Sequence, residues 1–274
     1  MSATITAADI NKLRQATGAG MLDCRKALTE SNGDFEAAID WLRKQGQKVA
    51  AKRSDREAKE GVVIAQTTAD NKSGIVLCIS AETDFVSNNA EFVAFVKSIA
   101  DAAISNNVNT AEELLEVSIG NQKVADMIND KLASIGEKIG ITRFERVNAE
   151  YVASYIHGAN RMGVLVSLTK AAPEAGKDVA MQIAAMNPLA VDESSIAPET
   201  IAREREIAIE QIKAEGKPAE MAEKIAVGKV NKFLKDNTLI HQPFVKDNGK
   251  SVADYLKSID ADLKVIDFKR VALG

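Results

Sequence analysis

The chain has 274 residues with 35 basic and 39 acidic side chains, a net charge of −4, and 46% of its residues are hydrophobic. This length allows about two domains with real cores, and the composition excludes disordered, collagen-like and low-complexity classes. No apolar run approaches the roughly 18 residues that span a bilayer, and the N-terminus lacks a signal-peptide pattern, so we expect a cytoplasmic protein without a membrane partner.

Residues 5–46 are typical of three short helices. Thr6 can cap the first helix, which ends at Gly18 and Gly20. The second begins at Met21, and Asp34 caps the third, whose apolar residues recur at helical spacing. We therefore predict a three-helix N-terminal domain and a basic linker over residues 1–55.

The basic linker lies between Arg43 and Glu60, where seven basic residues face three acidic ones. One interpretation is a solvated continuation of the third helix that joins two domains, which we favour. The other is a basic face that docks on an acidic partner. The basic residues are Arg43, Lys44, Lys48, Lys52, Arg53, Arg56 and Lys59.

From residue 61 the hydrophobic period changes to that of strands. A hairpin is predicted from strands 62–65 and 74–79, followed by helices and a returning strand over 139–144. The same layout recurs with strands 151–156 and 162–168, a helix from Pro173 and a last strand over 263–271. This repetition predicts an α+β core with antiparallel sheets, built by internal duplication.

We place the first core subdomain at residues 56–147 and the second at residues 148–197 and 237–274. Residues 198–236 break the pattern, because two amphipathic segments flank a turn at 215–218. They predict an antiparallel helical hairpin inserted into the second subdomain. A protruding interaction arm and a self-contained hairpin both fit this pattern.

Side chains that carry metal or redox chemistry are scarce. The only histidines are His157 and His241 and the only cysteines Cys24 and Cys78, with no metal-ligand spacing among them. We therefore expect no metal, no cofactor, and reduced thiols, with Cys78 in a core. The small aromatic content of 4% and the acidic balance argue against direct nucleic-acid binding.

Motifs of enzymes are also missing. There is no GxSxG or HExxH sequence. Gly249-Lys250-Ser251 imitates the end of a phosphate-binding loop, but Phe244 stands where that motif needs a glycine. Gly18-Ala19-Gly20 follows a predicted helix rather than a strand and lacks the third glycine of a dinucleotide fingerprint. An enzyme would be favoured only by a deep pocket around His157.

The segment Glu82–Asn88 connects the second predicted strand to a helix and places Asp84 beside Phe85. A core position for Phe85 is the plain interpretation. However, adjacent residues of a loop tend to point in different directions, and burying both side chains in one apolar site would be costly. An exposed Asp-Phe tip that acts as a wedge is the alternative.

Several motifs, in this order, closely resemble bacterial translation elongation factor Ts over essentially the whole chain. They are TGAGMLDCRKAL over Thr17–Leu28, TDFV over Thr83–Val86, His157-Gly158 with Arg161-Met162-Gly163, Met186-Asn187-Pro188, and QPFV over Gln242–Val245. The resemblance implies a ubiquitin-associated-like N-terminal domain, a duplicated α+β core and a coiled-coil arm. Contacts of the C-terminal helical module that many family members carry are not transferred to this sequence.

The resemblance also implies a guanine nucleotide exchange factor for elongation factor Tu that performs no covalent chemistry. Asp84 and Phe85 would form the wedge that disturbs the Mg²⁺ and phosphate site of the partner, with Thr83 and Val86 holding its turn. Arg14, Met21 and the surface near His157 would dock on the partner. The arm leaves open a homodimer or a heterotetramer. A ubiquitin-associated-type adaptor is the rival class, although it explains only the N-terminal domain.

Overall fold

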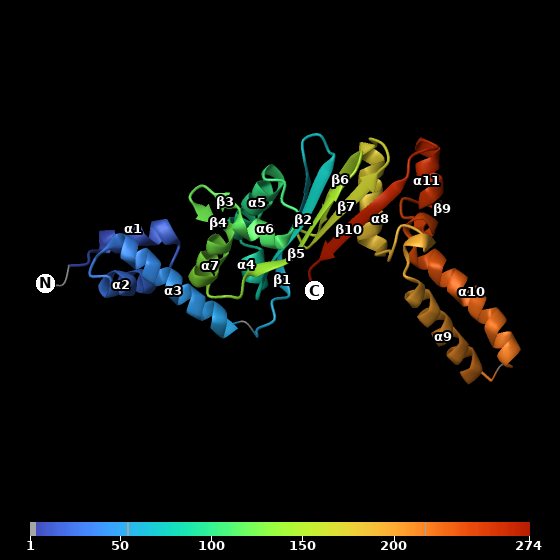
Figure 1. The fold of residues 1–274 in the computed structure, drawn as a ribbon, viewed down its shortest axis with the longest axis horizontal. Coiled ribbons are helices and arrows are strands. Elements are labelled where there is room, and N and C mark those ends of the chain that lie inside the picture. Colours follow the sequence, from blue (N-terminus) through green and yellow to red (C-terminus); the bar gives the residue numbers. More distant parts are fainter. Residues whose placement is uncertain (1–3, 54, 217) are drawn as a thin grey trace.

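The computed structural model describes residues 4–53, 55–216 and 218–274, without the side chains of Gln47, Val49–Lys52, Ala219 and Glu220. Three helices, α1 (Ala7–Thr17), α2 (Met21–Glu30) and α3 (Phe35–Arg53), form the N-terminal module at one end of an elongated molecule (Figure 1). Thr6 and Asp9 form a capping box on α1, and Gly18 ends it at φ 69°. The three predicted helices are therefore confirmed, whereas the ubiquitin-associated-like assignment stays a prediction.

Helix α3 continues to Arg53, well beyond residue 46, where we expected the three-helix segment to end. The basic stretch is thus mainly helix, as the favoured interpretation predicts, and only a short connection precedes the next strand. Within it, Arg53 and Arg56 bind Glu82 of the core at 2.7 and 3.1 Å. These two cations are therefore already paired within the chain. The side chain of Lys52 lies outside the described residues.

The N-terminal module contacts the core through α3 and α7 (Val124–Ile135). Gly46 is buried at this crossing, and a Cβ atom on it would lie 2.7 Å from the Cβ of Ala133. Helix backbones can approach this closely only where a side chain is missing. The glycine therefore sets the register in which the module sits on the core.

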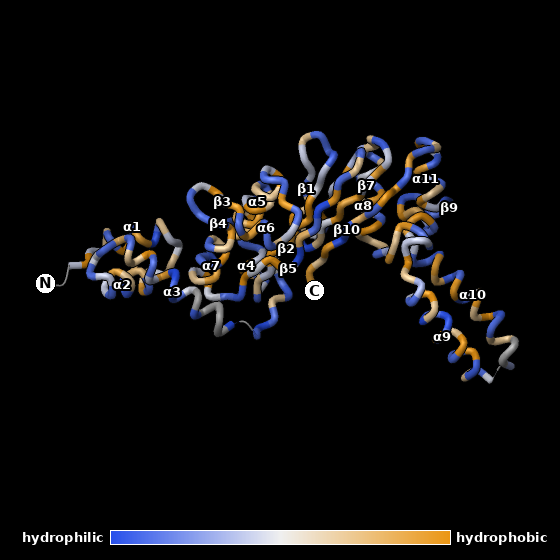
Figure 2. The backbone as a smooth tube through the Cα atoms, viewed as in Figure 1, coloured by the Kyte–Doolittle hydropathy of each residue, from blue (hydrophilic) through white to orange (hydrophobic). Residues whose placement is uncertain are grey.

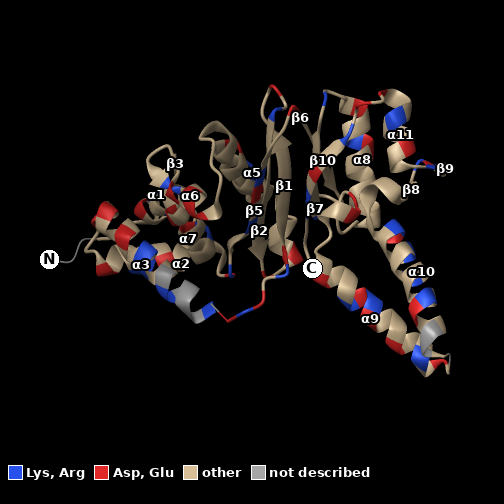
Figure 3. Ribbon diagram, turned by 45° about the vertical axis from the view of Figure 1, so that its right-hand side comes forward, with Lys and Arg blue, Asp and Glu red and all other residues tan. Residues whose placement is uncertain are grey.

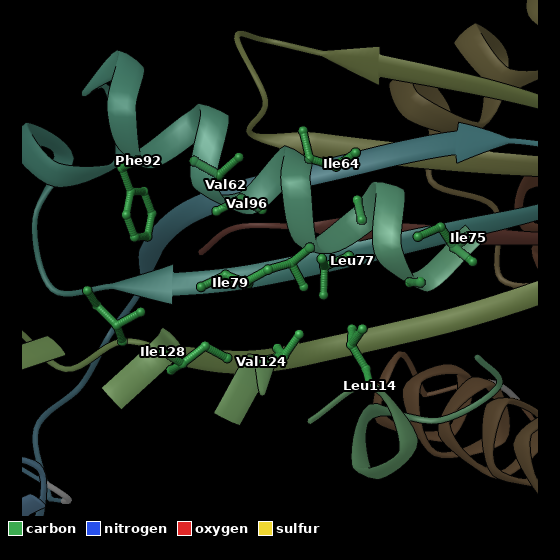
Figure 4. Close-up of a cluster of buried hydrophobic side chains, with 14 of the residues drawn as sticks. Val62, Ile64, Ile75, Leu77, Ile79, Phe92, Val96, Leu114, Val124 and Ile128 are labelled. Carbon is green, nitrogen blue, oxygen red and sulfur yellow. The ribbon is translucent and has the colours of Figure 1, made fainter. Parts of the chain in front are cut away.

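The first sheet consists of β1 (Glu60–Thr67), β2 (Ser73–Ala81) and β5 (Gly140–Asn148), antiparallel in the order β1-β2-β5. Between β2 and β5 the chain forms α4 (Asp84–Ser87), α5 (Ala90–Ser105), α6 (Ala111–Glu116), the two-residue strands β3 (Ser118–Ile119) and β4 (Gln122–Lys123), and α7. Figure 4 shows the resulting core, in which aliphatic side chains of β1 and β2 meet Phe92 of α5 and Ile128 of α7.

The second sheet consists of β6 (Tyr151–His157), β7 (Met162–Leu168) and β10 (Val265–Ala272), antiparallel in the order β10-β7-β6. In both sheets the returning strand pairs with the second strand of the hairpin, so the connectivity is the same. Helix α8 (Pro173–Met186), the strands β8 (Pro243–Phe244) and β9 (Asp247–Ser251), and α11 (Val252–Ile259) complete this half. The antiparallel α+β class is confirmed, while the domain boundaries stay predictions.

The two sheets pack face to face. Their shared cluster includes Val63 and Val76 from the first sheet and Val152 and Leu165 from the second, all fully buried. The helices lie on the outer faces of the sheets, so the core has helix, sheet, sheet and helix layers. In Figure 2 the hydrophobic residues concentrate on the strands of both sheets. This burial of apolar surface is the main source of core stability.

The inserted hairpin consists of α9 (Pro198–Ala214) and α10 (Ala219–Asn237) and projects from the second half (Figure 1). Its own buried seam contains Ala208, Ile212, Ala222 and Ala226, a cluster separate from those of the core. Charged residues, both basic and acidic, occur along both helices (Figure 3). The predicted hairpin is confirmed, its coiled-coil character stays a prediction, and Lys217 of the predicted turn lies outside the described residues.

Both cysteines are free and buried. Cys24 lies in the N-terminal module, and Cys78 lies in the cluster between the two sheets, which confirms its predicted core position. Burial raises the pKa of each thiol, since it disfavours the charged thiolate. No helix in the described part of the chain is both long and apolar enough to cross a membrane.

Candidate functional site

The segment predicted as an irregular connection contains one helical turn, α4, which begins after Thr83. The expectation of a plain loop was therefore wrong. Within the turn the side chains divide between two environments. Ser87 is buried and Val86 packs against the first core, whereas Asp84 is exposed and Phe85 is 86% exposed. The core interpretation of Phe85 is wrong, because the turn directs its inner residues, not Phe85, to the core.

Glu137 binds the residues from which this turn begins. It lies just after α7, where Gly136 at φ 77° reverses the chain. Its Oε2 accepts hydrogen bonds from the backbone N–H groups of Glu82 and Thr83, both at 3.1 Å, and its Oε1 accepts one from the Thr83 hydroxyl at 2.6 Å. Hydrogen bonds to an ionised carboxylate are among the stronger ones in proteins.

Glu82 makes the reciprocal contact. Its carboxylate accepts a hydrogen bond from the backbone N–H of Lys138 at 2.7 Å and binds Arg53 and Arg56. Partial burial acts to raise the pKa of Glu82, but the hydrogen bonds from Lys138, Arg53 and Arg56 outweigh it and lower the pKa from 4.5 to about 2. The ionised carboxylate thus joins the end of the N-terminal module to the base of the exposed turn.

A groove runs from Phe85 toward the N-terminal module. It is lined by Phe85 and Val86 of α4, Phe92 of α5, Lys131 and Ile135 of α7, and Gly18 of the module. Asn89, Glu91 and Ser134 also line it, so the groove beside the turn is mixed apolar and polar. The turn therefore does not stand on an isolated surface.

The three residues predicted to dock are all exposed. Arg14 and Met21 lie on the N-terminal module, and Met21 is 50% exposed beside Leu22, which is 82% exposed. His157 ends β6, and its Nδ1 lies 3.0 Å from the hydroxyl of Tyr155. Nothing in the geometry assigns these residues a role, so their docking function stays a prediction.

The turn between β6 and β7 brings Arg161 toward the exposed turn of the first half. The backbone N–H of Val63 donates to the carbonyl of Asn160 at 2.7 Å, which places this turn beside β1. Arg161 binds Glu60 at 2.6 Å. Its pKa is raised first by Glu60 and more weakly by the negative charge of Asp84. Asp84 therefore lies within electrostatic range of the second half of the core.

Sequence reasoning missed Glu137 and Glu60 as parts of this site, and it gave Glu82 no role beyond the first position of the candidate segment. Glu137 is 54 residues away from Thr83 along the chain, and no periodic pattern connects them. Arg161 appeared only as part of a motif. Among the described residues there is no group of three or more His, Cys, Asp and Glu side chains that could hold a metal ion.

Comparison with known proteins extends these observations. A family model described as Elongation factor TS matches residues 82–274. The chain is 50% identical to Elongation factor Ts of Christiangramia forsetii and 51% identical to that of Flavobacterium psychrophilum, over 99% of this chain and 100% of each relative. It is 43% identical to Elongation factor Ts of Methylococcus capsulatus, over 99% of this chain and 92% of the relative.

By class, the protein is therefore a translation elongation factor. More particularly, the chain belongs to the elongation factor Ts family, whose members are nucleotide exchange factors. The family match begins at Glu82 and covers the exposed turn, the core from α5 onward and the helical hairpin, whereas β1 and β2 precede it. These are the regions that an adaptor built on the N-terminal domain alone would leave unexplained.

Proposed function

We propose that this protein promotes GDP release from elongation factor Tu in the bacterial cytoplasm by inserting the turn at Thr83–Val86 near the Mg²⁺ and phosphate site of that GTPase. The observation that carries the proposal is the 86% exposure of Phe85 on a turn anchored to the core by Glu137. A large apolar side chain held in water by a fixed backbone is suited to fill a slot in a partner.

The exchange step is negative coupling between two ligands of the same GTPase. A factor that binds the nucleotide-free GTPase more tightly than the GDP-bound form must weaken GDP binding by the same factor. Moving the elements that hold Mg²⁺ achieves this, because the cation neutralises phosphate charge. The factor itself then needs no covalent chemistry.

The residues of the turn have different roles in this proposal. Phe85 enters an apolar slot of the partner, and Asp84 competes for polar contacts near the metal. Thr83 and Val86 hold the turn from the core side. Thr83 donates a hydrogen bond to Glu137, and Val86 packs against the first core. Arg14, Met21 and His157 supply docking area around it.

The test is the rate of release of a fluorescent GDP analogue from elongation factor Tu, measured by stopped flow with this protein in excess. We expect Asp84→Ala and Phe85→Ala each to slow release at least severalfold. Ile259→Ala is the matched control, since Ile259 is an exposed apolar residue on α11, 49% exposed, outside the proposed contact. Wild-type rates in both turn variants, with intact folding, would refute the assignment of the wedge.

We also infer that the helical hairpin is an interaction arm rather than a stabilising element, which leaves a homodimer or a heterotetramer with elongation factor Tu as the assembly. The support is that its buried seam packs only within the hairpin. Light scattering of the protein with and without residues 198–236, alone and with the partner, distinguishes these assemblies. An unchanged mass per complex in every mixture contradicts a role of the arm in assembly.

A further inference from the structure

The exposed turn is too short to hold its own orientation. Helix α4 has four residues, and isolated helices of this length are not stable in water. Its N-cap residue, Thr83, makes no side-chain hydrogen bond to the N–H groups of the turn. The Thr83 hydroxyl donates instead to Glu137. The direction in which Phe85 points must therefore be fixed by groups outside the turn.

Two residues fix the inner side of the turn against the core. Val86 packs against the first core, and Ser87 beside it is buried. These contacts hold the C-terminal end of the turn. They leave the entry of the chain at Glu82 and Thr83 to be held by other groups.

Glu137 holds that entry. Its carboxylate accepts hydrogen bonds from the backbone N–H groups of Glu82 and Thr83 and from the Thr83 hydroxyl. It therefore restrains the backbone on both sides of the Glu82–Thr83 peptide bond. Glu137 is itself half-buried and placed by the Gly136 turn. The reciprocal bond from Lys138 N–H to Glu82 closes the contact at its other side.

We propose that Glu137 is a positioning residue for nucleotide exchange: it fixes the entry of the turn so that Asp84 and Phe85 reach the partner in one orientation. The proposal rests on the proposed function of that turn. Glu137 acts through its hydrogen bonds to Thr83 and to the backbone of Glu82. Its removal allows the turn to sample other orientations, of which few deliver Phe85 to its slot.

The kinetic test uses Glu137→Ala and Glu137→Gln in the full chain, with GDP release from elongation factor Tu measured over a range of factor concentrations. We expect Glu137→Ala to lower the maximal release rate about tenfold, as misplacement of a positioned group does. The concentration at half-maximal rate should change little, because the docking surfaces are untouched. Glu116→Gln is the control, since Glu116 forms a surface ion pair with Lys123 that is separate from the turn and its anchor.

Rescue by the amide distinguishes positioning from charge. In Glu137→Gln the amide oxygen can accept hydrogen bonds from the two backbone N–H groups. The amide nitrogen can donate a hydrogen bond to the oxygen of the Thr83 hydroxyl. We therefore expect a maximal rate within about threefold of wild type, because the geometry of neutral hydrogen bonds is retained. If Glu137→Gln is as slow as Glu137→Ala, the hydrogen-bond assignment is wrong.

A second measurement does not depend on exchange activity. Hydrogen–deuterium exchange of residues 82–87 should accelerate by at least about tenfold in Glu137→Ala, while α5 keeps its protection. Thr83→Val, which removes a single donor, should have a smaller effect that disappears in the Glu137→Ala background. This variant keeps the proposal testable if Glu137→Ala folds poorly.

The proposal and the proposed function fail in different ways. If Phe85→Ala slows release but Glu137→Ala retains the wild-type maximal rate, the positioning role of Glu137 is overturned and the wedge stands. If Asp84→Ala and Phe85→Ala both retain the wild-type rate, the wedge itself is refuted. Accelerated hydrogen exchange at residues 82–87 in Glu137→Ala would then still show that Glu137 orders the turn.

Discussion

The two halves of the core close the same junction with different chemistry. In each half the connection that follows the second hairpin strand binds the segment that precedes the returning strand. In the first half this clasp joins Glu82 and Thr83 to Glu137 and Lys138. In the second half, Thr169 exchanges hydrogen bonds with Lys264 at 3.0 and 2.9 Å.

The second clasp is completed by surface charge, since Lys170 binds Asp260 at 2.9 Å and Asp262 at 3.4 Å. The chain then enters α8 directly, and Ala175 and Gly176 of its first turn are already buried. In the first half the chain leaves the clasp into α4, whose outer residues, Asp84 and Phe85, are exposed. One connectivity therefore serves packing in one half and presents a free turn in the other.

The equivalence of the halves can be tested at two glycines that occupy the second position of β2 and of β7. A Cβ on Gly74 would lie 2.9 Å from Val152, and one on Gly163 would lie 2.9 Å from Val63, each across the sheet interface. We expect Gly74→Ala and Gly163→Ala each to lower the free energy of unfolding by about 1–3 kcal/mol through overpacking. Urea unfolding followed by circular dichroism measures this.

Gly228 of α10 is the control for these substitutions, because nothing lies within 4 Å of its added Cβ. Gly228→Ala should raise the stability of the helix by up to about 1 kcal/mol. A loss confined to one of the two sheet glycines would show that the halves are not equivalent at their interface.

The difference in chemistry between the two clasps can be tested by measuring stability at low pH. The pKa of Glu82 is lowered to about 2, so its contribution to stability is complete above its ordinary pKa of 4.5 and is lost as the pH falls from there toward 2. The difference in unfolding free energy between wild type and Glu82→Gln should therefore shrink across this window. Urea titrations at several pH values measure it.

Asp260 provides the comparison from the second clasp. The Lys170 side chain, followed by the backbone N–H of Asp262, lowers the pKa of Asp260, so the effect of Asp260→Asn has the same sign. It should be smaller and should weaken with added salt, because exposed ion pairs are screened. An Asp260→Asn effect as large as that of Glu82→Gln would contradict the distinction between the clasps.

Removal of the helical hairpin, which is inserted into the second half of the core, is expected to have the smallest effect on stability. The hairpin seam is separate from the core clusters, and the base of the hairpin is tied by the backbone bond from Leu189 N–H to Asn237 O at 2.9 Å. Replacing residues 198–236 with a short flexible linker should leave the thermal midpoint of the core almost unchanged. A large fall, measured by calorimetry, would mean that the hairpin supports the core.

Much of the fold could be predicted from local signals. Thr6, Asp34 and Pro173 sit at or beside the helix starts that they indicated, and strand periodicity located both hairpins. Local signals favoured a helical continuation through the basic stretch, but they did not predict that Arg53 pairs with Glu82, because these two residues lie far apart along the chain. An ion pair between residues so far apart in the chain leaves no local pattern in the sequence.

The candidate site was predictable only in its outward part. Asp84 and Phe85 stood out as an acid and an aromatic residue on a connection, and the motif resemblance pointed to the same segment. The helical form of the turn and its anchor, Glu137, could not be predicted, because both depend on a contact across 54 residues. A carboxylate has no periodicity by which its hydrogen-bond partners could be recognised.

The burial of both native thiols has a practical consequence for spectroscopy. Cys24 has no exposed surface, Cys78 is 3% exposed, and the raised pKa of each thiol slows its reaction with maleimides. A cysteine introduced at exposed Glu206 of α9 would therefore be the one thiol that a dye reaches quickly in the folded protein. The wild-type sequence thus already serves as a background for fluorescent tracking of the arm during exchange.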